Sequence, residues 1–67
     1  MAMDRNDGLR RALVALPTTK LAVELGITHS AVSQWRRVPA ERVLAVERLT
    51  GVSRHDLRPD LYPQEAA

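Results

Sequence analysis

The chain has 67 residues, a length that fits one small domain with a single core. It contains no cysteine, which excludes a disulfide framework and a thiolate metal site. The apolar fraction is 45%, but no apolar run approaches a membrane span, and the N-terminus lacks the apolar block of a signal peptide. We therefore expect one cytoplasmic domain over residues 1–67, with no membrane partner.

The formal net charge of +2 is unevenly distributed. Residues 25–40 contain Arg36 and Arg37 and no acid, whereas the flanking stretches mix acids with bases and the tail is net acidic. A basic, acid-free polar stretch favours a polyanionic partner such as nucleic acid. Ordinary solvated surfaces carry similar patterns, so this indication needs the support of a motif.

A first helix is expected to begin after a cap at Asn6 or Asp7 and to end at Pro17, which disfavours helical geometry before it. Its apolar face follows a helical spacing and comprises Leu9, Ala12, Leu13 and Leu16. Residues 1–6 and 64–67 show no periodic pattern, and we expect them to be flexible ends.

Residues 18–37 are expected to form two short helices joined by a glycine turn. The hydroxyl of Thr18 or Thr19 can cap the first of these helices, and Gly26 suits the left-handed residue after it. The inward side chains of this helix are Leu21, Ala22 and Leu25.

Thr28 is the expected cap of the next helix, which should extend over about residues 29–37. Val32 and Trp35 are spaced to face the core. The opposite side is polar and acid-free, with His29, Ser30, Ser33, Gln34 and Arg37.

A further helix should begin at Pro39 and end at Gly51. Its expected inward face comprises Ala40, Val43, Leu44, Val46 and Thr50. Glu47 falls within that face, and either Arg54 or Arg58 of the tail can pair with it; the alternative is that the helix is exposed there.

The tail begins with a short turn in which Ser53 and Asp56 are spaced as a capping box. Three apolar residues that follow are expected to pack back on the core, namely Leu57, Leu61 and Tyr62. Together these patterns predict an all-α fold, a small helix-turn-helix bundle of four to five short helices.

Five residues match the spacing of the phage-repressor helix-turn-helix: Ala22, Gly26, Ile27, Val32 and Trp35. That motif has a small residue, a glycine four positions later, and apolar residues six and nine positions beyond the glycine. Thr18 stands where repressors often carry glutamine, and its hydroxyl can make the same kind of phosphate contact.

The resemblance extends over residues 9–63, through LGITHSAVSQWRRVPAERVLAVERLTG and the later RHDLRPDLYP. These stretches resemble phage Cro proteins and the related YdaS-type antitoxin-like regulators. The resemblance implies a lambda-repressor/Cro-like fold and a small transcriptional repressor that binds a pseudo-palindromic operator as a homodimer. It also implies a bacterial or phage-infected cell, with the protein associated with the nucleoid.

In such a protein the helix over residues 29–37 enters the major groove of double-stranded DNA. The expected base-contacting residues are Gln34, His29, Ser30, Ser33 and Thr28. Gln34 leads because its amide can bond adenine N6 and N7 together. The expected phosphate-contacting residues are Thr18, Thr19, Lys20, Arg36 and Arg37.

Other roles remain open for some of these residues. Ser30, Ser33 and Gln34 can be ordinary solvent-facing side chains, and Arg36 can instead cover Trp35 or pair with Glu41. The alternative function is an antitoxin-like or adaptor protein whose helical domain mainly binds a partner protein.

An enzyme is not expected, because the chain offers no convergent nucleophile, base and acid. We also expect no cofactor and no small-molecule ligand. Two histidines without cysteine make a poor metal site, so no metal is expected.

Overall fold

A computed structural model describes residues 6–63, and these residues form helices and connecting segments without a strand. The predicted all-α fold class is therefore confirmed. In chain order the elements are α1 (Asp7–Ala15), α2 (Thr18–Leu25), α3 (His29–Ser33), the 3-10 helix η1 (Ala40–Arg42), α4 (Val43–Thr50) and α5 (Arg54–Leu57). No helix within residues 6–63 is long and apolar enough to cross a membrane. The expected flexible ends fall on residues 1–5 and 64–67, outside the described residues, and on Asn6.

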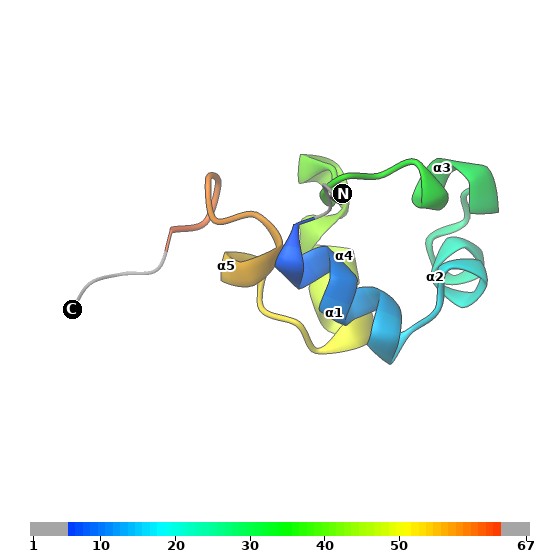
Figure 1. Ribbon diagram of the computed structural model, residues 1–67, viewed down its shortest axis with the longest axis horizontal. Coiled ribbons are helices and arrows are strands. Elements are labelled where there is room, and N and C mark those ends of the chain that lie inside the picture. The colour runs from blue at the N-terminus through cyan, green and yellow to red at the C-terminus, as the bar shows by residue number, and fades with distance from the viewer. Residues whose placement is uncertain (1–5, 64–67) are drawn as a thin grey trace.

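The α2–α3 pair lies at one end of the molecule and α5 at the other (Figure 1). Between them, α1 packs against both α4 and α5, and α2 packs against α4 as well as α3. Helices α1, α4 and α5 thus form a scaffold that holds the α2–α3 pair through α2.

One core joins side chains from every α-helix. Its buried members are Leu9, Ala12, Leu21, Ala22, Val32, Val38, Val43, Val46, Val52 and Leu57. Six partly exposed residues pack against it: Leu13, Leu16, Leu25, Ile27, Trp35 and Tyr62. Trp35 therefore belongs to the core side of the molecule, as its spacing predicts.

Three residues predicted to face the core are exposed instead: Ala40, Leu44 and Leu61. The turn after Pro39 is a 3-10 helix, and α-helical geometry begins only at Val43. Because a 3-10 helix has about 3.0 residues per turn, the buried stripe starts in a different register. It narrows to Val43 and Val46, and Leu44 points outward with an exposed fraction of 47%.

Local capping sets the ends of several helices. The side-chain oxygen of Asn6 accepts the Leu9 N–H at 2.9 Å and caps α1, which settles the choice between the two candidate caps. Gly26 and Gly51 end α2 and α4 with φ of 72° and 81°, the left-handed conformation that glycine adopts without steric cost.

The start of α2 differs from the prediction. Pro17 is the cap residue, and no side chain caps the helix, so the predicted hydroxyl cap of Thr18 or Thr19 is wrong. The carbonyl of Pro17 already accepts the Leu21 N–H at 2.9 Å, which places both threonines inside the first turn rather than before it.

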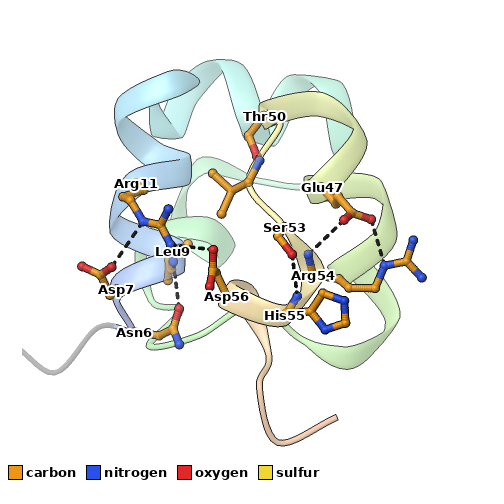
Figure 2. Close-up of polar contacts among 11 residues, drawn as sticks. Asn6, Asp7, Leu9, Arg11, Glu47, Thr50, Ser53, Arg54, His55 and Asp56 are labelled. Atoms are coloured by element: carbon orange, nitrogen blue, oxygen red, sulfur yellow. Dashed lines mark hydrogen bonds and ion pairs between the residues drawn. The ribbon is translucent and has the colours of Figure 1, made fainter. Parts of the chain in front are cut away.

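Helix α1 touches α5 through its backbone at Gly8 and through an ion pair beside it. The Arg11 guanidinium lies 2.9 Å from the Asp56 carboxylate and 3.2 Å from that of Asp7 (Figure 2). The hydrogen bond to Asp56 is the main cause that raises the pKa of Arg11. This pairing joins the first and last helices of the fold.

Glu47 pairs with Arg54, one of the two tail arginines considered for it. Its carboxylate accepts the Arg54 backbone N–H at 3.0 Å and the Nε–H at 3.1 Å (Figure 2). Ser53 caps α5 with its hydroxyl, but Asp56 does not complete a capping box because its carboxylate is engaged by Arg11. The charge within the inward face of α4 is thereby compensated.

Candidate nucleic-acid interface

A tight turn centred on Gly26 joins α2 to α3. The Gly26 N–H bonds to the Val23 carbonyl at 3.1 Å, and the Ile27 N–H bonds to the Ala22 carbonyl at 3.0 Å. Ala22 is 3% exposed and Val32 is fully buried. A small residue on α2 thus allows α3 to pack closely on it, which is the arrangement of a helix-turn-helix.

The hydroxyl of Thr28 caps α3, as its position in the sequence predicts. Its oxygen accepts the Ala31 N–H at 3.0 Å. Thr28 itself is exposed at the start of the helix. Its oxygen keeps a second lone pair and its O–H can still donate, so the cap role leaves the hydroxyl able to make further hydrogen bonds.

Four predicted base-contacting residues form one exposed surface, which we call the α3 polar surface: His29, Ser30, Ser33 and Gln34. The Gln34 amide Nε2 donates to the Ser30 hydroxyl at 3.3 Å, and the Ser33 hydroxyl donates to the Ser30 carbonyl at 3.4 Å. The 3.3 Å contact of Gln34 is long and therefore weak, so this amide can exchange it for a ligand at little cost.

The α-helix ends at Ser33, earlier than the predicted end near residue 37. Gln34 is the C-terminal cap, and the Trp35 N–H bonds back only three residues, to the Val32 carbonyl at 3.1 Å. The chain leaves helical geometry because Val38 must reach the core, where it is fully buried, and because Pro39 restricts Val38 to an extended conformation.

Arg36 and Arg37 therefore lie on the segment after α3 and not on the helix itself. Both are exposed. The carbonyl of Arg36 accepts the Asn6 N–H at 2.8 Å, which ties this segment to the start of α1. The two cations follow the α3 polar surface closely in the sequence, but the position of their backbone depends on contacts from elsewhere in the chain.

Thr18, Thr19 and Lys20 form the first turn of α2. Thr19 and Lys20 are exposed, whereas Thr18 is half-buried. No side chain caps this helix, so its first-turn N–H groups have no side-chain acceptor, and such groups can donate to water or to an anion.

A model of the family described as Bacterial toxin YdaS matches residues 17–66. The chain belongs to the YdaS family. This match confirms the predicted relationship to YdaS-type proteins, although the family's description names a toxin and not an antitoxin. The finer resemblance to Cro proteins stays a prediction. No curated protein and no solved structure matches the chain significantly.

The YdaS match begins where α1 has ended, so it spans the helix-turn-helix, α4, α5 and most of the tail. In this YdaS family member α1 adds Leu9 and Ala12 to the core. Among residues 6–63 no group of three or more histidines, cysteines or acids is placed to hold a metal ion.

Sequence reasoning missed two tail residues of this YdaS protein that lie beside the candidate interface. Asp60 approaches Arg37, with 4.0 Å between its Oδ2 and the Arg37 Nη1. Arg58 binds Asp60 and holds the pKa of that carboxyl at about 2, below its ordinary value of 3.8. The stretch around Arg37 is acid-free in the sequence, but in the folded chain Asp60 lies close to Arg37. The sequence feature that could have indicated these two tail residues is the Arg-Pro-Asp triplet at positions 58–60.

Proposed function

We propose that this YdaS family member is a sequence-specific double-stranded DNA-binding regulator, a Cro-like repressor that places α3 in the major groove. The observation that carries the proposal is the two-sided character of α3. Val32 is fully buried against α2, while the α3 polar surface and the Thr28 cap are exposed on the outside. A helix with one packed face and one exposed, acid-free polar face suits insertion into a polyanion's groove.

Base contacts would come from the first turn of α3 and from the residue that ends it. His29 and Ser30 lie in the first turn, which enters the groove first. The Gln34 amide gives up only a 3.3 Å contact with Ser30 when it turns to a base. Its carbonyl and NH₂ then match adenine N6 and N7. Ser33 completes this set on the same surface.

Phosphate contacts would flank α3 on both sides. Arg36 and Arg37 follow it, and the uncapped first turn of α2, with Thr18, Thr19 and Lys20, precedes it. Exposed cations and free helix N–H groups recognise phosphate without sequence preference. These contacts would fix the register in which the α3 polar surface meets the bases.

We further propose a non-enzymatic homodimer that binds a pseudo-palindromic operator in the cytoplasm of a bacterial or phage-infected cell, without a cofactor. Two equal half-sites would then lie about one helical turn of DNA apart, because the two-fold axis of the dimer must match that of the DNA. Each copy would contribute one α3.

A second candidate is a protein-interaction module, such as an antitoxin-like protein or an adaptor. Two valines favour it: Val14 and Val23 are 84% and 72% exposed on α1 and α2. Exposed apolar side chains are one feature of protein interfaces where they form a contiguous patch. The α3 polar surface lacks the aromatic residues and methionines that interface cores favour, so we rank this function second.

The proposed function is tested by titrating the purified full chain with duplex DNA from its own genomic neighbourhood across a salt series. We expect affinity to fall steeply with salt. Gln34→Ala should weaken binding to the specific site by about 5- to 150-fold, since one bidentate base contact is worth about 1–3 kcal/mol. Arg37→Ala should weaken binding to all sequences and reduce the salt slope by about 1.

Arg48→Ala is the matched control, because it removes the same charge from an exposed position on α4. Its effect on affinity should be smaller than that of Arg37→Ala. If the unmodified chain binds no duplex, or if both α3-side variants bind as tightly as the control, the DNA-binding proposal is wrong. A stable complex with a partner protein would then favour the second candidate.

A further inference from the structure

Arg58 is the one charged residue that is buried among residues 6–63, with an exposed fraction of 9%. Its Nη1 donates to the Val38 carbonyl at 2.9 Å across 20 residues of sequence. Its Nε and Nη2 donate to the two carboxylate oxygens of Asp60 at 2.9 and 2.7 Å. A planar guanidinium can meet three acceptors in fixed directions, which the single ammonium of a lysine cannot do as well.

The tail itself closes around Arg58. The N–H groups of Leu61 and Tyr62 both bond to the Arg58 carbonyl, at 3.0 and 2.8 Å. Pro59 fits the second position of such a turn because its ring fixes φ. This short turn places the Asp60 carboxylate against the Arg58 guanidinium, and the carboxylate neutralises the buried charge of Arg58.

The contact with Val38 lies directly after the segment that carries the two proposed phosphate-binding arginines. Arg37 stands between two anchored carbonyls, that of Arg36 held by the Asn6 N–H at 2.8 Å and that of Val38 held by Arg58 at 2.9 Å. Oδ2 of Asp60 lies 4.0 Å from Arg37 Nη1. The tail therefore acts on both the backbone and the side chain of Arg37.

We propose that Arg58 is a positioning residue for DNA binding: through Val38 and Asp60 it fixes the segment on which Arg37 meets a phosphate. This inference rests on the proposed function. Arg58 does not itself contact DNA. Losing it releases the Val38 carbonyl and leaves Asp60 without its main partner, so that this carboxylate competes with phosphate for Arg37.

The test is a double-mutant cycle in DNA binding, with Arg37→Ala and Arg58→Lys made singly and together in the full chain. Arg58→Lys keeps the charge but cannot hold Val38 and both oxygens of Asp60 together. We expect it to weaken DNA binding by about fivefold and to lower the salt slope by about 1. In the Arg58→Lys background, Arg37→Ala should weaken DNA binding by less than about twofold, because the contact between Arg37 and phosphate is already lost.

A residue that only stabilises the fold would give a different result. Ala12→Gly weakens α1 and replaces neither Val38 nor Asp60, the residues that the Arg58 side chain bonds, so in that background Arg37→Ala should keep its full cost in DNA affinity. Arg58→Met is a second variant for the same cycle, and circular dichroism checks that it folds. If Arg58→Met does not fold, the Arg58→Lys cycle alone is the test.

Two failures are distinguishable. If the unmodified chain binds DNA but the costs of Arg37→Ala and Arg58→Lys multiply, the positioning role is overturned while the proposed function stands. If the unmodified chain shows no salt-sensitive binding to duplex DNA, the proposed function fails, and the positioning role fails with it.

Discussion

Gly8 is a residue at which α1 and α5 approach each other closely. A Cβ built there would lie 2.3 Å from the carbonyl oxygen of Asp56 and 2.9 Å from the backbone nitrogen of Leu57. Backbone atoms cannot turn aside as a flexible side chain does, so a methyl group would force the two helices apart. Glycine is required at this position by packing, and its sequence neighbours give no indication of that requirement.

Gly8→Ala should therefore destabilise the fold by about 1–3 kcal/mol, the usual cost of overpacking, although alanine is the better helix former. Urea unfolding followed by circular dichroism measures the change. Arg10→Ala, at an exposed position on the same helix, is the control and should stay within about 0.5 kcal/mol. A Gly8→Ala variant as stable as the control would contradict the close approach of α1 and α5.

At the scale of the element, α3 has only five residues and cannot be stable as an isolated helix. It is held by the Thr28 cap at one end, by the packing of Val32 on α2 and by the tight Val32–Trp35 turn at the other. The conformation of the α3 polar surface thus depends on a few specific contacts.

Thr28→Ala should cost about 1 kcal/mol of stability, because it leaves the Ala31 N–H without its side-chain acceptor. Thr28→Ser retains the hydroxyl and should recover most of that loss. Thermal unfolding of the two variants in the absence of DNA separates the cap from any role in binding. Equal losses for alanine and serine would mean that the methyl group of Thr28 matters and the cap does not.

At the scale of the whole molecule, hydrogen bonds and an ion pair connect segments that are distant in sequence. Asn6 binds the segment after α3, Arg11 binds Asp56, and Arg58 binds Val38. In a small domain with a core of mainly valine, leucine and alanine, such polar contacts help to select one arrangement of short helices.

The Arg58–Asp60 pair should make part of this stability depend on acid. Arg58 lowers the pKa of Asp60 to about 2 from 3.8, so the folded chain binds this proton more weakly than the unfolded chain. The contribution is fully present above about pH 4 and is lost as the pH falls toward about 2. Urea midpoints measured over this range should fall less for Asp60→Asn than for the unmodified chain.

Arg58→Met should show the same smaller decline, since it removes the cause of the shift. If all three proteins lose stability in parallel between about pH 4 and 2, the pair does not contribute in this way.

Patterns within a few residues were sufficient to predict much of the fold. The Asn6 and Thr28 caps, the end of α1 before Pro17 and the two glycine stops are confirmed. Helix caps and stops depend on hydrogen bonds and φ preferences within about four residues, so they are encoded locally.

Only the tertiary structure decided how these elements are used. Helix α3 stops at Ser33 because Val38 is drawn into the core, and the 3-10 turn after Pro39 turns Leu44 outward. Above all, the tail returns Arg58 and Asp60 to the segment that carries Arg37, more than twenty residues earlier in the chain. The sequence around Arg37 does not indicate that Asp60 lies near it, because this contact depends on how the tail packs on the core.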